Sequence, residues 1–364
     1  MKEYLERTAL AEKKSAIKLR VKKAVDGIDF GDAEIYVKTS DKSGKFYIKY
    51  NLCYEKDPIG TTYKKGDETE PLTWYNGSNY GCNRSNYRIK AASVCKWNGE
   101  SFEKVYDVLQ QGEISMAFKE MLVDGGVKAG DFVGGFHGDE IIKVIDGKPM
   151  VSMALDGACI PLDGREEREY EGDILTFEQT TLINRCNTPG MNIVEHSQSF
   201  VFDTMGIHDR QKAKFITSDY EEGGKYALDC TGSYLQMCTF WRLNRGEKDV
   251  RICDDLKFYD ENGKLVNQSD TSAYNHGDFA WTGVETEKIN RTVEYNGNVG
   301  VYGRVGFEIV EDSVECESAK IMVRTFGDNK WYCTFKSKNS TGQPKKGEEW
   351  ILDLLYYIDY NSER

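Results

Sequence analysis

The feature that most constrains the fold of this chain is its long series of short runs rich in β-branched and aromatic residues, most of them bounded by Gly, Asn or Asp. Such runs are typical of β-strands, because branched and ring-bearing side chains pack well on a pleated surface. They predict strands over residues 33–37, 46–52, 87–94, 141–145, 150–155, 174–183, 196–203, 213–216, 235–241, 256–259, 264–266, 306–310, 320–325, 330–335 and 350–360.

Three adjacent pairs of these runs are predicted to form β-hairpins. The turns between them are Asp146-Gly147, Asn262-Gly263 and Gly327-Asp328-Asn329. Asp-Gly and Asn-Gly are favoured in tight hairpin turns, which need positive φ. Since the strands do not alternate with ten-residue helical segments, a parallel α/β sheet is not indicated. The pattern favours a mainly β fold, a large antiparallel β-sandwich.

Two short helices are predicted near the N-terminal part of the chain. Residues 4–25 carry apolar side chains at helical spacings, with Glu early and Lys or Arg late, as the helix dipole prefers. Residues 113–123 repeat apolar side chains at helical intervals before a Gly-Gly stop. No stretch has the length or bias of a linker, so we expect a single domain over residues 1–364 with an N-terminal helical extension over residues 1–25.

Charge and composition limit the classes of partner. The formal net charge is −12, and the acidic residues are spread along the chain. This disfavours nucleic acid and anionic membranes as partners. The first 14 residues are charged where a signal peptide would be apolar, so the sequence predicts a cytoplasmic protein. It leaves the oligomeric state open.

Cofactor and metal motifs are not found in the sequence. The ten cysteines form no CxxC pair, so reduced, mostly buried thiols are expected. HExxH, EF-hand, GxSxG, P-loop and GxGxxG patterns do not occur. We therefore expect no transition-metal site and no cofactor.

Scarce histidines mark the first candidate site. Only four occur, and His137 lies in the segment GGFHGDE, where small residues let a ligand approach closely and where Asp139 and Glu140 follow. Glu140 shares a face with His137 only if Gly138 supports a bulge. The other interpretation is a glycine-rich turn in which His137 makes a structural hydrogen bond.

His196 is the second candidate. In the segment EHSQSFVFD, period-two alternation places His196 and Gln198 on the same face as Phe200 and Phe202. A His and a Gln that continue an aromatic row predict a strand lining a sugar-binding groove. A partly buried His paired with Gln198 or a backbone carbonyl explains the pattern equally well.

Tyr274 and His276, in the loop segment YNHGD, are the third candidate, because loops on a rigid β-scaffold collect binding residues. An ordinary solvated turn is the alternative. Aromatic residues mixed with amides predict sugar contacts near Trp74 and Tyr75, although core packing is the commoner use of Trp. Trp241 is a further candidate contact.

Several segments together resemble a β-sandwich module of phage tail-fibre and related bacterial proteins that act on glycans. The segments are GGFHGDE, EHSQSFVFDTMGIHD, residues 226–241, GDNKWYCTF and KGEEWILDLLYYI. The resemblance covers roughly residues 130–360 and implies a carbohydrate-facing surface. It implies that His137, Glu140 and His196 are the positions most like the shared pattern of the module.

The leading functional hypothesis is a carbohydrate-active enzyme, a polysaccharide lyase for uronate-containing glycans. His196 would act as base and Tyr274 or His137 as acid, while Gln198 or Arg185 would neutralise the uronate carboxylate. A glycoside hydrolase would instead use two carboxylates, Glu140 with Glu195 or Asp139. A non-catalytic glycan-binding or structural module is the third hypothesis.

Overall fold

The computed structural model describes residues 16–24, 29–56, 62–65, 68–71, 84–110, 114–122, 131–134, 140–185, 191–224, 226–228, 234–241, 255–260, 262–270, 280–282, 291–297, 299–323 and 328–363. All regular elements in these residues are β-strands, which confirms the predicted mainly β class. No helix with the length and apolar character needed to cross a bilayer occurs in this part of the chain.

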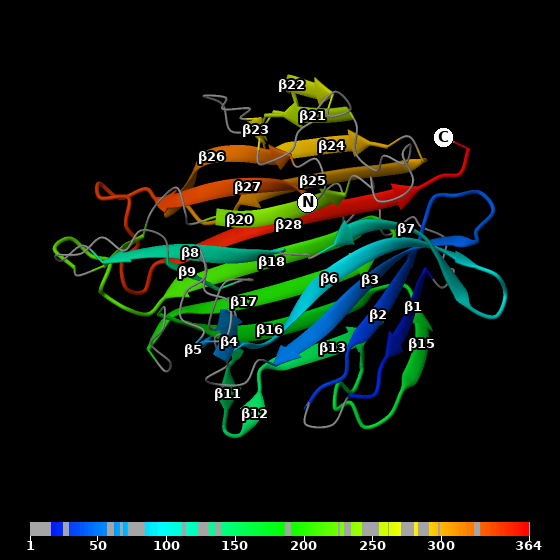
Figure 1. The fold of residues 1–364 in the computed structure, drawn as a ribbon, viewed down its shortest axis with the longest axis horizontal. Helices are drawn as coiled ribbons and strands as arrows, with labels where there is room; N and C mark the ends of the chain where they lie inside the picture. Colours follow the sequence, from blue (N-terminus) through cyan, green and yellow to red (C-terminus); the bar gives the residue numbers. More distant parts are fainter. Residues whose placement is uncertain are drawn as a thin grey trace.

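Most of the described strands form one large sheet (Figure 1). Its strands are β1 (Ile17–Val21), β2 (Ala33–Lys38), β3 (Phe46–Lys56), β6 (Arg84–Trp97), β7 (Phe102–Gln110), β10 (Glu140–Ile142), β13 (Val151–Leu155), β14 (Ala158–Cys159), β15 (Arg168–Gly172), β16 (Leu175–Asn184), β17 (Asn192–Asp203), β18 (Gly206–Phe215), β21 (Asp255–Tyr259), β22 (Leu265–Asp270), β24 (Thr292–Asn296), β25 (Val301–Ile309) and β28 (Glu349–Tyr360).

A smaller sheet and two separate hairpins account for the other strands. The smaller sheet contains β8 (Ser115–Leu122), β9 (Asp131–Val133), β19 (Tyr226–Leu228), β20 (Tyr234–Trp241), β23 (Ala280–Thr282), β26 (Val314–Val323) and β27 (Asp328–Ser337). The hairpins are β4 (Thr62–Lys65) with β5 (Glu68–Pro71), and β11 (Val144–Ile145) with β12 (Lys148–Pro149).

The pairing order of the large sheet explains how distant segments meet. From β15 it runs through β1, β2, β3 and β6, and β6 also pairs with the hairpin strand β7. β10 then joins β6 to β16 in parallel with β6, which makes the sheet mixed. From β16 the order continues through β17, β18, β28, β25, β24, β21 and β22, all antiparallel.

The inner face of the large sheet carries the hydrophobic core. In β17 every second side chain from Val194 to Phe202 is buried, as the period-two pattern predicts. The smaller sheet contributes to the same core, because Phe118 of β8 lies 5.6 Å from Phe215 and 6.2 Å from Trp350, ring centroid to ring centroid. The two sheets thus share one apolar interior, while the finer assignment as a sandwich stays a prediction.

Both helix predictions are wrong where the structure describes them. Residues 113–123 contain β8, in which Met116 pairs with Leu235 of β20 and Phe118 pairs with Val133 of β9. Residues 17–21 form β1, and its alternate side chains enter the core. Short apolar runs fit helix and strand periods alike, so pairing with distant strands decides. The rest of the predicted N-terminal helix, residues 1–15, lies outside the described residues.

The predicted hairpins are confirmed. β11 pairs with β12 across Asp146-Gly147, where both residues have positive φ (50° and 75°). β21 pairs with β22 across Asn262-Gly263, and β26 pairs with β27. Two-residue turns with positive φ match the twist of the strands that they connect.

A buried carboxylate fastens the end of the chain to the loop between β2 and β3. Asp41 accepts hydrogen bonds from the backbone N–H and the hydroxyl of both Ser43 and Ser362. Burial alone would raise the pKa of Asp41, but these hydrogen bonds lower it to about 2. Asp41 therefore holds residues more than 300 positions apart in sequence, as an ionised carboxylate.

Replacing Asp41 with Ala is expected to lower the free energy of unfolding by about 2 kcal/mol at pH 7, because hydrogen bonds to a charged acceptor are lost. The pKa of Asp41 is depressed, so this stabilisation is present above pH 4 and is lost as the pH falls toward 2. Urea denaturation at pH 7 and at pH 2.5 measures both values. Glu363→Gln, which breaks an exposed ion pair with Lys42, is the control and should change stability by less than 0.5 kcal/mol or so. An equal effect of the two substitutions would contradict the prediction.

Candidate functional site

A row of buried polar side chains crosses the inner face of the large sheet. Each is at most 4% exposed. β16, β17 and β18 are adjacent antiparallel strands, so the inward-facing members of each strand lie side by side. The row consists of Glu140, Gln179, Thr181, His196, Gln198, Asp209 and Gln211.

His196 and Glu140 form the charged part of this row. The His196 Nδ1 atom lies 3.0 Å from Oε1 of Glu140, and its Nε2 atom lies 3.2 Å from Oε1 of Gln211. Thr181 donates a hydrogen bond of 2.6 Å to the same Glu140 oxygen. Both ring nitrogens face oxygen acceptors, so the arrangement suits a doubly protonated imidazolium. Burial alone would lower the pKa of His196, but the hydrogen bond with Glu140 and its charge raise it above its usual value.

Asp209 is the second buried acid of the row. Its Oδ2 atom accepts hydrogen bonds from the amide nitrogens of Gln211 (2.6 Å) and Gln198 (3.3 Å). Among the described residues, no partner reaches its other oxygen. Burial is the largest influence and raises the pKa of Asp209 to about 7, although the two amides and His196 act in the opposite direction. Its carboxyl group is therefore about half protonated at neutral pH.

The row lies inside the core, where a polymer does not reach it in this conformation. His196 and Glu140 are each 1% exposed. A general base has to lie within hydrogen-bond distance of the proton that it removes. The structure therefore brings together His196, Glu140 and Gln198, as predicted, but places them in a buried network rather than along an open groove.

The other proposed carboxylate partners are engaged as well. Gln198 donates to the backbone carbonyl of Ile114. The Arg185 guanidinium lies 2.7 Å from Asp219 Oδ2 and 3.5 Å from the ring centroid of Tyr226. Arg185 is 5% exposed, so it serves as a fixed internal cation here.

Glu195 does not lie with Glu140. It precedes His196 in β17 and therefore points to the opposite face of the sheet, where it forms an ion pair of 2.5 Å with Lys143. Two carboxylates on opposite faces do not flank a single glycosidic bond. The predicted hydrolase pair of Glu140 and Glu195 is not assembled.

The remaining candidate residues lie outside what the structure describes in side-chain detail. Trp241 ends β20, and only its backbone is described. The others fall outside the described residues altogether: His137, Asp139, Tyr274, His276, Trp74 and Tyr75.

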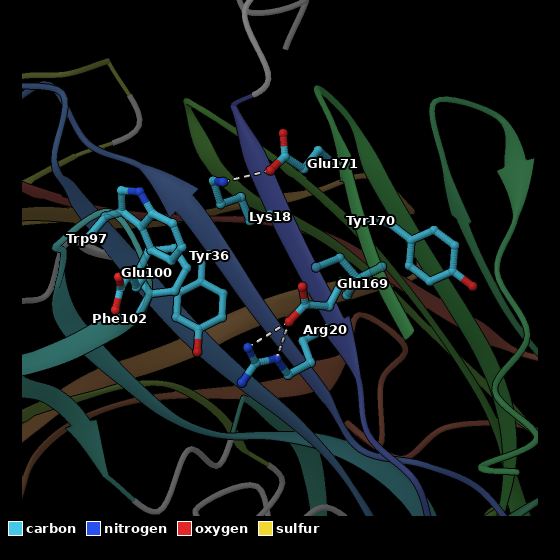
Figure 2. Close-up of a pocket in the computed structure, with 10 residues that line it drawn as sticks. Lys18, Arg20, Tyr36, Trp97, Glu100, Phe102, Glu169, Tyr170 and Glu171 are labelled. Carbon is cyan, nitrogen blue, oxygen red and sulfur yellow. Dashed lines mark hydrogen bonds and ion pairs between the residues drawn. The ribbon is translucent and has the colours of Figure 1, made fainter. Parts of the chain in front are cut away.

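A groove on the outer face of the large sheet is the best-formed open site among the described residues (Figure 2). Its empty volume is about 460 Å³, part of which is open to solvent. Trp97 and Phe102 lie on one side of the groove and the β15 segment on the other, with two basic side chains between them. The lining residues are Lys18, Leu19, Arg20, Tyr36, Trp97, Glu100, Phe102, Glu169, Tyr170 and Glu171.

The aromatic side of the groove is a small apolar cluster separate from the main core. Phe102 stacks on Tyr36 with ring centroids 3.8 Å apart, and Trp97 lies 4.7 Å from Phe102. Tyr36 is buried by the stack, and its hydroxyl donates to Glu34. Trp97 and Phe102 are only partly buried, so part of each ring contacts solvent.

The groove exists because a hairpin positions the two rings. Trp97 and Phe102 pair across the end of β6 and β7. Between them, the Asn98 side chain accepts hydrogen bonds from the backbone N–H groups of Glu100 and Ser101. Gly99 adopts a φ of 106°, which favours glycine. The Asn-Gly turn flanked by two aromatic residues is the sequence signal by which this site could have been found.

Ion pairs join the floor of the groove to its far side. Lys18 Nζ lies 2.6 Å from Glu171 Oε1, and Arg20 Nη2 lies 2.6 Å from Glu169 Oε1. Both pairs link β1 to β15 and are partly exposed. Charged side chains of both signs therefore lie beside the aromatic rings, with donors and acceptors facing the groove.

A second hollow borders the β11–β12 hairpin, which projects from the large sheet at the lower edge of Figure 1. Residues Ile145, Lys148, Met150, Ser152 and Glu178 are among those that line it. No aromatic side chain lines this hollow among the described residues. It therefore offers no ring surface to a ligand.

Comparisons with known proteins assign no family to the chain. No protein-family model matches it, and no curated protein matches it at a significant level. The resemblance to tail-fibre modules stays a prediction, and functional inference depends on the geometry of the chain itself.

Proposed function

We propose that this protein is a glycan-binding β-sheet module that holds an oligosaccharide in the groove beside Trp97. The observation that carries the proposal is the partly exposed aromatic pair, Trp97 and Phe102, next to Lys18 and Arg20 on an otherwise polar sheet surface. The two sheets serve as the rigid scaffold, packed in the manner of a sandwich.

Sugar recognition needs these two kinds of surface together. The apolar C–H faces of a pyranose contact aromatic rings, and its hydroxyl groups exchange hydrogen bonds with charged and amide side chains. Arg20 and Lys18 supply donors, whereas Glu169 and Glu171 supply acceptors. The volume of about 460 Å³ suits one or two sugar units.

Binding is favoured over catalysis because the groove and the buried acid–base groups lie on opposite faces of the sheet. Lys18 and Arg20 alternate along β1 with side chains that enter the core. His196 and Glu140 belong to that core and are 1% exposed. A binding module needs no general base, so the buried network does not count against this function.

Replacing Trp97 with Ala is expected to weaken oligosaccharide binding at least about tenfold, because an aromatic surface and its hydrogen-bonding surroundings are lost together. Isothermal titration of the whole chain against a panel of neutral, amino and uronate oligosaccharides measures the effect. The same uronate samples, monitored by absorbance for an unsaturated product, show whether lyase activity accompanies binding.

Tyr302→Ala is the matched control, since Tyr302 is a partly exposed aromatic residue that contacts Tyr357 elsewhere on the sheet. This variant should bind like the unmodified protein. If no oligosaccharide of the panel binds, or if the two variants lose affinity equally, the proposed function is wrong.

A further inference from the structure

The charges around the groove are unequal. Three carboxylates, Glu100, Glu169 and Glu171, line it together with two cations, Lys18 and Arg20. Each cation is already paired at 2.6 Å, Lys18 with Glu171 and Arg20 with Glu169. The remaining charge at the groove is therefore negative, as is that of the whole chain, which carries a net charge of −12.

Glu100 is the source of this excess. It lies in the turn between Trp97 and Phe102, and its side chain is exposed at the rim of the groove. Its backbone N–H is bound by Asn98, which fixes the position of the turn. Within the described residues, no cation lies at ion-pair distance from its carboxylate, which makes Glu100 available to a ligand.

The aromatic side of the groove already accepts an ammonium group. Lys18 Nζ lies over the Trp97 ring, 4.7 Å from its centroid, while it also pairs with Glu171. A ring face and a carboxylate acting on one ammonium are a favourable combination, because the ring quadrupole and the anion attract the same charge. Glu100 and the exposed parts of Trp97 and Phe102 repeat these components on the open side of the groove.

An anionic glycan meets the opposite situation. A uronate carboxylate placed in the groove faces three carboxylates, and the two cations that would neutralise it are engaged in ion pairs. Binding such a sugar requires breaking at least one of these pairs. A protonated amino group requires no such rearrangement.

We infer that the groove takes oligosaccharides of amino sugars with free, protonated amino groups, with Glu100 as the residue that determines this specificity. The inference rests on the proposed glycan-binding function and assigns its ligand class. The ammonium group lies at Glu100, and the pyranose ring lies against Trp97.

The test compares oligomers of glucosamine with the same oligomers after N-acetylation, which removes the charge and keeps the sugar backbone. Titration of the whole chain at pH 6 is expected to show about three- to tenfold tighter binding of the free-amine oligomers. Glu100→Gln should abolish this preference and leave the affinity for the acetylated oligomers within twofold. Glu178→Gln removes an exposed carboxylate at the other hollow and should leave the preference unchanged.

The outcomes separate the two proposals. If the acetylated or uronate oligomers bind as tightly as the free-amine oligomers, and Trp97→Ala still abolishes binding, the inference is wrong while the glycan-binding function stands. If Glu100→Gln and Glu178→Gln reduce the preference equally, the effect comes from the overall charge and the role of Glu100 is wrong. If no glycan of any charge binds, the proposed function fails, and the inference fails with it.

Discussion

Replacing Glu140 with Gln is expected to lower the free energy of unfolding by about 3–5 kcal/mol at pH 6, because it leaves the His196 imidazolium buried without its counter-ion. In the native protein the two groups lie 3.0 Å apart and both are 1% exposed. Water cannot replace the lost partner at this depth, so the imidazolium must release its proton or the sheet must open. Guanidinium denaturation followed by circular dichroism measures the loss.

The pH dependence of this loss follows from the direction of the His196 pKa. The pKa is raised in the folded protein, so the stabilisation by the ion pair is complete below the unfolded value of about 6.5 and is lost as the pH rises through the folded value. The difference between Glu140→Gln and the unmodified protein should therefore shrink at alkaline pH. Glu195→Gln, on the opposite face in a partly exposed pair with Lys143, should change stability by less than about 1 kcal/mol. A Glu140→Gln effect as small as this control would show that the buried pair does not stabilise the sheet.

Asp209→Asn is expected to have the second large effect, in the stabilising direction at high pH. The folded pKa of Asp209 is about 7, raised by burial, whereas the unfolded chain releases the same proton near pH 4. The folded state therefore holds more protons between these values, and stability falls as the pH rises from about 4 to about 7. This gap in pKa corresponds to at most about 4 kcal/mol. Asn keeps the shape and the acceptor of Asp209 without the charge that burial disfavours.

Unfolding free energies of the two proteins at pH 5 and at pH 8 test this prediction. At pH 5 they should be similar, and at pH 8 the Asn variant should be more stable by about 2–4 kcal/mol. Asp353→Asn serves as the control, since Asp353 lies 3.5 Å from Arg210 on the neighbouring strand and is less deeply buried. Equal pH profiles for Asp209→Asn and the unmodified protein would contradict a protonated Asp209.

Period-two alternation predicted β17 correctly but not its surroundings. The sequence placed His196 and Gln198 on the face of Phe200 and Phe202, and the burial of all four confirms this. Whether that face lines a groove or a core depends on the strands and the sheet that cover it. Those partners come from distant parts of the chain, and an alternation pattern carries no record of them.

The groove was missed for a related reason. The β6–β7 turn is a local feature that the sequence displays, since an Asn-Gly turn separates Trp97 from Phe102. The far side of the groove comes from β15, about 70 residues later, and reaches it because β15 pairs with β1. No spacing rule relates Trp97 to Glu169 and Glu171.

The sequence by itself determined the mainly β class, most strand positions, the hairpin turns at Asp146-Gly147 and Asn262-Gly263, and the faces of β17, because alternation and turn chemistry act over a few residues. The tertiary structure alone decided that β8 is a strand, that His196 and Glu140 meet inside the core, and that aromatic and acidic side chains form a groove outside it. These features depend on strand pairing between distant segments, and the free energy that selects such pairing comes from burial shared by the whole sheet.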